Sequence, residues 1–234
     1  MKKRVSLLIG KERPDLQRPQ MELEALTLLL APRPQGSYAL LIGPQAVHDL
    51  ALYLAGCLLI KGLRAIYIDA ANAFDPYLLS RLAQRAGKSP RGPLSRVFVS
   101  RAFTCHQLET LILEDLGEEL SRRPVDFLLV SGLPTLFFDE AVPFGEAKRI
   151  FLEIISRLRG LAHQGLPLLV THDDSYPGPR RRPLLVPLIK AAEVVARIEK
   201  GEGGLEVSLE KPVDLERKRI TVPEEGLSDI IRWR

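Results

Sequence analysis

The chain is predicted to be an α/β protein with a mostly parallel central sheet and helices on both of its faces. Short, continuously apolar segments alternate along the sequence with longer amphipathic segments, which is the pattern of strands alternating with helices. The apolar segments lack polar alternation, as expected of strands that are covered on both faces. With 234 residues, 46% of them hydrophobic, the chain can bury one sizeable core, so we expect a single core domain.

Each element follows from its local pattern, and glycines such as Gly62 and Gly165 mark predicted helix ends. The predicted strands are residues 5–9, 38–42, 64–68, 96–99, 127–130 and 167–171. The predicted helices are residues 21–30, 45–59, 76–86, 105–122 and 147–162. Polar alternation over residues 205–209, after a glycine-rich turn, predicts a C-terminal β-hairpin with residues 194–199 as its first strand.

These elements divide the chain into an N-terminal arm (1–22), a core domain (23–212) and a charged C-terminal tail (213–234). The apolar run after the basic start is too short for a signal peptide, and no uncharged run is long enough to span a membrane, so we expect a cytoplasmic protein. Cys57 and Cys105 lie in apolar helical segments and are predicted to be buried free thiols. The net charge of +4 is compatible with nucleic-acid binding.

Ligands of open α/β sheets bind at the carboxyl ends of the strands, so the residues after each strand are the candidates for function. After the strand at 38–42 come a glycine turn and a helix start, the setting of the P-loop pattern G-x-x-x-x-G-K-[ST]. Gly43 is in place, but the last three positions are His48, Asp49 and Leu50. An acid therefore stands at the position of the P-loop lysine.

Several short segments, in the same order along the chain, resemble the RecA/RadA recombinase family. They are 36–37 (Gly-Ser before the first core strand), 67–76 (YIDAANAFDP, family FIDAEHALDP), 99–108 (VSRAFTCHQL, family ARAFN…Q), 128–133 (LLVSGL, family LLIDSV) and 168–173 (LLVTHD, family VVxTNQ). The resemblance covers about residues 23–209 and implies a RecA-like P-loop fold.

Placed on this resemblance, the departures of the chain fall on the catalytic positions of the family. The Walker A lysine corresponds to Asp49 and its hydroxyl neighbour to Leu50, the water-polarising glutamate to Ala71, the Walker B aspartate to Ser131, and the nucleotide-sensing pair to His172 and Asp173. Gly43, Asp69 and Pro76 remain as scaffold residues. Phosphoryl transfer depends on positioning and charge neutralisation. We therefore expect a degenerate nucleotide site without ATP, Mg²⁺ or catalysis.

A basic loop follows the strand at 167–171. Residues 176–183 combine Tyr176, prolines and a glycine with Arg180, Arg181 and Arg182, a composition typical of an exposed irregular segment. The resemblance implies that the loop after this strand contacts DNA. Three adjacent arginines can contact about two or three phosphates. The alternative is a solvated run of charge with no ligand.

The leading hypothesis is an inactive RecA/RadA-like paralogue in DNA recombination or repair, which binds DNA, an active recombinase or another repair partner, alone or as an oligomer. A second hypothesis is a structural or interaction subunit without nucleic-acid contact. A third is a metal-dependent hydrolase that uses His48, Asp49, His172 and Asp173. No metal-ligand spacing such as H-x-x-x-H supports the third, so no metal is expected, and His48 is predicted to face solvent at a helix start. Arg101 is predicted to pair with an acid.

Overall fold

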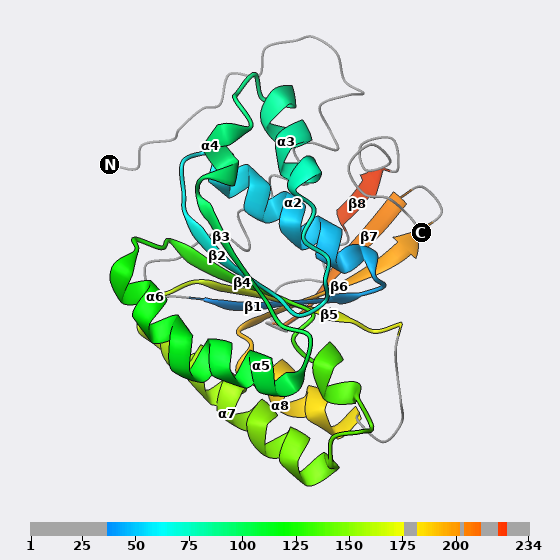
Figure 1. The fold of residues 1–234 in the computed structure, drawn as a ribbon. Helices are drawn as coiled ribbons and strands as arrows, with labels where there is room; N and C mark the ends of the chain where they lie inside the picture. The colour runs from blue at the N-terminus through cyan, green and yellow to red at the C-terminus, as the bar shows by residue number, and fades with distance from the viewer. Residues whose placement is uncertain (1–36, 176–181, 202–203, 212–219, 224–234) are drawn as a thin grey trace, which may run out of the picture.

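The central feature of the computed structural model, which describes residues 37–175, 182–201, 204–211 and 220–223, is an eight-stranded sheet (Figure 1). The strand order is β3-β2-β4-β5-β1-β6-β7-β8. Neighbours from β3 to β6 pair in parallel, and β7 and β8 are added by antiparallel pairing. The strands are β1 (Tyr38–Gly43), β2 (Ala65–Asp69), β3 (Val97–Arg101), β4 (Phe127–Ser131), β5 (Leu168–Asp173), β6 (Val194–Gly201), β7 (Gly204–Lys211) and β8 (Ile220–Pro223). The predicted α/β class with a mostly parallel sheet is confirmed.

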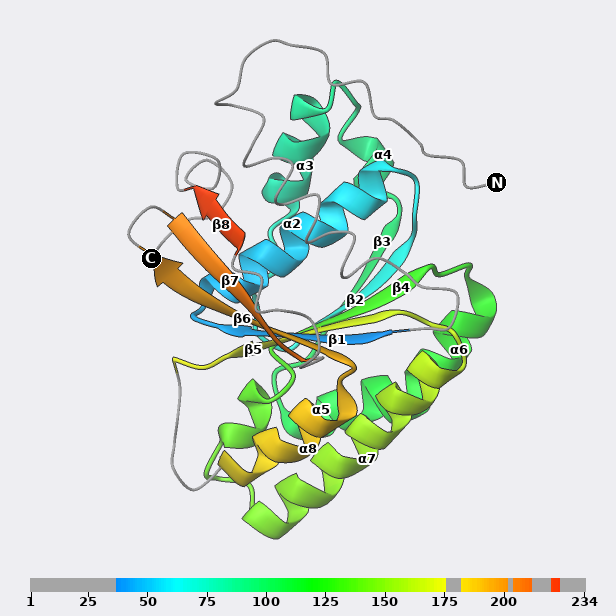
Figure 2. The ribbon, with the colours of Figure 1, turned by 180° about the vertical axis from the view of Figure 1, so that it is seen from behind.

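Helices cover both faces of this sheet, as Figures 1 and 2 show from opposite sides. One layer contains α2 (Ala46–Ile60), α3 (Pro76–Arg85) and the short α4 (Arg91–Leu94). The other layer contains α5 (Cys105–Thr110), the π-helical turn η1 (Leu111–Asp115), α6 (Leu116–Arg122), the 3₁₀ turn η2 (Thr135–Phe138), α7 (Phe144–His163), η3 (Arg182–Leu184) and α8 (Leu185–Ala191). Within the described residues, no helix has the length and apolarity that crossing a bilayer requires.

The strand β1 shows why the sheet holds two cores. Its residues alternate between the faces: Ala39 and Leu41 pack in the cluster under α2, whereas Tyr38, Leu40 and Ile42 pack in the cluster under α5 to α8. All five side chains are buried. A strand that is apolar at every position is therefore the sequence signature of this two-sided burial, as the sequence analysis assumed.

Besides the 3₁₀ turns η2 and η3, three elements went unpredicted, and each has a reason. The four residues of α4 are too few for helical periodicity. Helix α8 contains Pro187, and a proline within a segment usually argues against a helix. Here the proline stands in the first turn, where its missing N–H would have no partner within the helix. Strand β8 lies in the predicted tail (213–234), where it pairs with β7. The predicted strand 5–9 and helix 21–30 lie outside the described residues.

The turn after β4 brings two loops into close contact. Gly132, directly after β4, has a φ of 69°, the left-handed region that favours glycine. A Cβ atom there would lie 2.6 Å from the Cβ of Ala71, in the loop after β2. Only glycine therefore allows the ends of β2 and β4 to meet as they do.

Replacing Gly132 with alanine is expected to lower the free energy of unfolding by about 2–4 kcal/mol. The positive φ is unfavourable for alanine, and the new methyl group would clash with Ala71. Urea denaturation measures the change. The matched control is Gly160→Ala in the last turn of α7, where a new Cβ meets nothing within 4 Å. The control is expected to raise stability by about 0.5–1 kcal/mol. Equal stabilities of the Gly132→Ala variant and the natural chain would contradict the close contact.

Candidate functional site at the carboxyl edge of the sheet

The ends of four neighbouring strands bring most of the predicted site residues together. In the sheet register, Gly43 of β1 lies opposite Asp173 of β5, and Asp69 of β2 lies opposite Ser131 of β4. Ala71 follows β2 at the same edge. The carboxyl edge of the sheet is thus one polar region, as parallel strand order predicts.

The connection between β1 and α2 is very short. Only Pro44 and Gln45 separate the end of β1 from the start of α2 at Ala46. The first helical N–H groups bond within this turn, with the Val47 N–H donating to Pro44 O at 2.7 Å and the His48 N–H donating to Gln45 O at 3.2 Å. The backbone here forms a tight helix entry, with these donors satisfied by the turn itself.

The glycine at position 43 has a packing cause within this fold. A Cβ atom at this position would lie 2.7 Å from the carbonyl oxygen of Ile198 in the neighbouring strand β6. Glycine is therefore required where the backbone of β1 approaches β6. A glycine at the end of this strand needs no phosphate to explain it.

His48 is the residue for which the sequence prediction was wrong. It was expected to face solvent, but it is only 4% exposed, and its ring points from the first turn of α2 toward the ends of β4 and β5. Its Nδ1 lies 2.7 Å from Thr171 Oγ1 and 3.2 Å from Ser131 Oγ. A polar ring is stable in this buried position because its nitrogen meets hydroxyl partners.

The hydrogen bonds around His48 suit a neutral ring. Thr171 Oγ1 accepts a bond from the Gly132 N–H at 2.9 Å, and its own proton can be donated to His48 Nδ1. In that arrangement Nδ1 accepts and the single ring proton is on Nε2. Burial lowers the pKa of His48 from 6.5 to about 4, although the nearby carboxylates of Asp173 and Asp69 act in the opposite direction. The neutral ring is the form that this site accommodates.

Asp69 organises the loop after β2. It is fully buried, and its carboxylate accepts bonds from the N–H groups of Ala73 at 2.9 Å and Phe74 at 3.1 Å. Its charge is paired with Arg101, whose Nε lies 3.1 Å away. The predicted role of Arg101 as the partner of an acid is thus confirmed. The surviving scaffold aspartate is a loop anchor.

The remaining predicted positions have different environments. Leu50 is buried in the core under α2 and is turned away from the edge. Asp49 lies in the first turn of α2, where the helix dipole favours an acid, and the N-cap residue is Gln45. Asp173 accepts a bond from the Ser175 N–H at 2.9 Å.

His172 is the second buried imidazole at this edge. It is 2% exposed, and its ring lies 6.1 Å from that of Phe138. Among the described residues its Nδ1 has no hydrogen-bond partner. Burial lowers the pKa of His172, so this ring too is held in its neutral form.

An open cleft of about 800 Å³ lies between the start of α2 and the loop before α3. Asp49 and Ala71 line it together with Phe74, Tyr77 and Arg81. Arg81 is paired with Asp75, whose carboxylate also caps α3 through the Tyr77 N–H. Cleft and buried His48 network therefore adjoin each other at one edge of the sheet.

The candidate DNA-contacting residues are not part of this geometry. Tyr176, Arg180 and Arg181 lie outside the described residues, and Arg182 begins η3 with a side chain that is likewise not described. For metal ions, the described part of the chain contains no group of three or more His, Cys, Asp or Glu side chains that could hold one.

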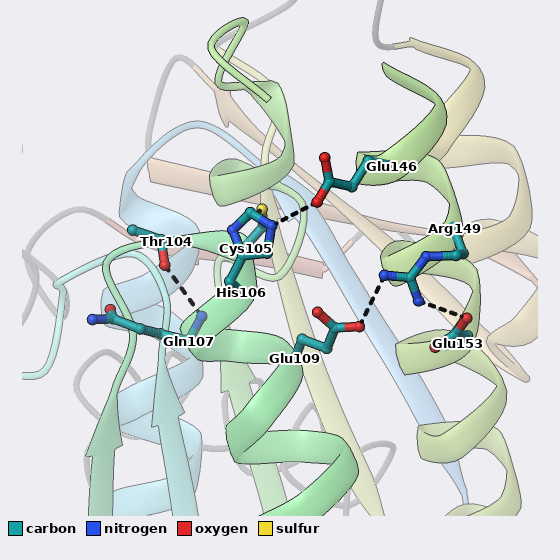
Figure 3. Close-up of polar contacts among 8 residues, drawn as sticks. All are labelled: Thr104, Cys105, His106, Gln107, Glu109, Glu146, Arg149 and Glu153. Atoms are coloured by element: carbon teal, nitrogen blue, oxygen red, sulfur yellow. Dashed lines mark hydrogen bonds and ion pairs between the residues drawn. The ribbon is translucent and has the colours of Figure 1, made fainter. Parts of the chain in front are cut away.

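A second polar cluster joins α5 to α7 (Figure 3). Cys105 Sγ lies 3.7 Å from His106 Nδ1, and His106 Nε2 lies 3.0 Å from Glu146 Oε1. Burial raises the pKa of the Cys105 thiol, so it remains protonated at neutral pH and is a poor nucleophile. Cys105 is a buried core thiol, as predicted, whereas Cys57 is half-buried.

Two further residues that shape this edge were not predicted from the sequence. Thr171 was taken as the last residue of a buried strand, yet its hydroxyl links His48 to the Gly132 N–H. Asn72, in the loop after β2, has a φ of 53°. A threonine at the end of an apolar strand, beside a histidine, was the available signal for the first. For Asn72, the only signal in the sequence was that asparagine tolerates a left-handed backbone conformation.

Comparison of the chain with the models of known protein families finds no family that matches.

The buried His48 makes stability depend on pH. Between pH 6.5 and about 4, the unfolded chain binds a proton at this ring that the folded protein does not. The contribution of the neutral ring to stability is therefore fully present above pH 6.5 and is lost as the pH falls toward 4, by about 3 kcal/mol in total. Urea denaturation across this pH range measures it.

His48→Gln is expected to flatten this pH dependence, because glutamine does not titrate. The control is His163→Gln on the exposed end of α7, which is expected to leave the dependence unchanged. His172→Gln separates the contribution of the neighbouring ring. A slope as steep in His48→Gln as in the natural chain would show that His48 is not the responsible group.

Proposed function

We propose that this chain is a RecA/RadA-like domain that neither binds nor hydrolyses ATP and that acts in DNA recombination or repair. It has a RecA-like P-loop fold with degenerate Walker motifs. It works by binding DNA, by docking onto an active recombinase or another repair protein, or by both. The family positions that depart from the catalytic pattern gather at one edge of the sheet, which supports a single altered site.

The observation that carries this proposal is the position of His48. In the pattern G-x-x-x-x-G-K-[ST], counted from Gly43, His48 stands at the second glycine. Its ring is buried against Thr171 and Ser131, and residues 46 and 47 of the pattern are already helical. A phosphate loop needs free backbone N–H groups and space beside them. Here the N–H groups of Val47 and His48 bond within the turn, and the His48 ring packs inward against Thr171 and Ser131.

The charges at this edge support the same conclusion. Asp49 stands at the lysine position, and Leu50 at the hydroxyl position is buried in the core. Ser131, at the position of the Mg²⁺-binding aspartate, is within hydrogen-bond distance of His48. Phosphoryl transfer depends on cations around the phosphates. Losing a single such group costs about 10²–10³ in rate, and here the lysine, hydroxyl and aspartate positions of the family pattern are all changed.

DNA binding is assigned to the loop between β5 and η3. It contains Arg180 and Arg181 and is followed at once by Arg182, the first residue of η3. The three guanidinium groups can contact about two or three phosphates. The net charge of +4 favours such contacts.

The natural chain is expected to show no ATP binding by isothermal titration at ATP concentrations up to about 1 mM. The contacts at this site do not offset the free-energy cost of removing water from the phosphates. The double variant Asp49→Lys, Leu50→Thr restores the two Walker A side chains but keeps His48 and the short turn. It is expected to remain without binding. An active P-loop ATPase serves as the positive control. Micromolar Mg·ATP binding by the natural chain would refute the proposal.

Replacing Arg180, Arg181 and Arg182 with alanine is expected to weaken DNA binding about tenfold or more at low salt, and to reduce the salt dependence by about two to three ions. Fluorescence anisotropy with labelled single- and double-stranded oligonucleotides measures both. The matched control replaces three exposed cations elsewhere, Lys61, Arg64 and Arg91, with alanine. If the arginine variant bound DNA as well as the control, a subunit without DNA contact through this loop would remain.

A further inference from the structure

The outer surface of α7 and α8 combines exposed apolar and basic side chains. The two helices pack against each other in the layer below the sheet, as both views show. The exposed apolar residues are Phe144 (39%), Leu152 (39%), Val186 (52%) and Ile189 (37%). Lys148, Arg159 and Lys190 are exposed on the same two helices. These seven residues are here called the α7–α8 surface.

The opposite edge of α7, toward α5, has quite different chemistry. Figure 3 shows Glu146 bonded to His106, and Arg149 bonded to both Glu109 and Glu153. The charged groups that link α7 to α5 thus each meet an opposite charge or a hydrogen-bond partner within the chain. These contacts are complete without a partner protein.

On the edge toward α8 the charges are not matched. Lys148, Leu152 and Arg159 follow one another at spacings of four and seven residues, which places them on one stripe of the helix. Within the described part of the chain, the side chains of Lys148, Arg159 and Lys190 form no ion pair. The stripe therefore has unneutralised positive charge beside solvent-exposed apolar groups.

We propose that the α7–α8 surface binds an acidic amphipathic helix of a partner protein. Such a helix places apolar residues at helical spacing against the exposed apolar groups, and its carboxylates meet the three cations. Apolar contact at the centre with charge pairs at the rim is the composition of stable protein interfaces. Scattered single apolar residues need no explanation, but these four are exposed on two helices that pack against each other.

Two other partners fit these residues less well. A nucleic acid would place its phosphates against four apolar side chains, which cannot replace the water that the phosphates lose. For an anionic membrane surface, three basic residues supply only a weak electrostatic attraction, since stable polybasic membrane sites use clusters of about four to eight. The mixture of aliphatic groups and a few cations therefore favours a protein helix.

This inference specifies the partner-docking part of the proposed function, but it rests on different residues. None of the seven residues belongs to the edge that holds His48 and Asp49. The docking surface and the altered nucleotide site can thus be tested, and can fail, separately.

The test uses the full chain and a fluorescein-labelled peptide of about 18 residues, with leucines at i, i+3, i+4 and i+7 and glutamates at most other positions. Fluorescence anisotropy is expected to show saturable binding that weakens several-fold when the salt concentration is raised. Lys148→Glu, Arg159→Glu, Lys190→Glu together are expected to lower the affinity about tenfold or more. The combination of Leu152→Ser, Val186→Ser and Ile189→Ser is expected to do the same.

Matched controls distinguish binding at this surface from nonspecific electrostatic and hydrophobic binding elsewhere on the protein. Lys61→Glu, Arg64→Glu, Arg91→Glu makes the same change of charge elsewhere, and Phe103→Ser removes another exposed apolar group. Both controls are expected to bind the peptide with an affinity within about twofold of the natural chain. Every variant is expected to keep the circular dichroism spectrum of the natural chain, which shows that it folds. A peptide of the same composition with its leucines out of helical spacing is expected not to bind.

The proposal is overturned if the amphipathic peptide does not bind, if the rearranged peptide binds equally well, or if the two triple variants leave its affinity unchanged. It is also overturned if phosphatidylserine vesicles or a DNA duplex require these residues while the peptide does not. In that case a membrane or a nucleic acid is the partner of this surface.

Discussion

Burial of the uncharged His48 ring is the interaction on which the carboxyl edge of the sheet depends. It joins α2, which follows β1 after only two residues, to β4 through Ser131 and to β5 through Thr171. The Thr171 hydroxyl extends the contact to the Gly132 N–H, and Gly132 in turn lies against Ala71 after β2. One imidazole thus connects the ends of the four strands that would otherwise border an open polar space. Its neutrality is a condition for all of these contacts, because a buried unpaired charge would cost more than they contribute.

The residues that support the resemblance to recombinases also stabilise the fold directly. Gly43 is required by the close approach of β6, and Asp69 holds the loop after β2 through two backbone bonds and an ion pair with Arg101. Such residues are kept by the packing of the fold whether or not a nucleotide binds. Their presence therefore bears on architecture, and function has to be argued from the side chains that stand in the site itself.

Sequence patterns predicted the strands and long helices well, because burial on both faces of a parallel sheet produces continuous apolar runs at 38–43 and 127–131. They failed for His48, since helical periodicity cannot tell whether a first-turn side chain points to solvent or across the strand ends. That direction is set by the short turn before α2. Thr171 was missed for a related reason: its partners His48 and Gly132 lie more than 35 residues away, and only the fold brings them together.

The completeness of the His48 network has a consequence for how the folded population responds to its surroundings. Proteins that leave a central polar site open are stabilised by their ligand in proportion to the logarithm of its concentration, so their abundance follows the metabolic state of the cell. Here an imidazole and two hydroxyls of the chain itself meet at the ends of β4 and β5, so this part of the edge is stabilised by its own side chains. Acidity, acting on that one ring, is a chemical variable to which this edge of the molecule responds.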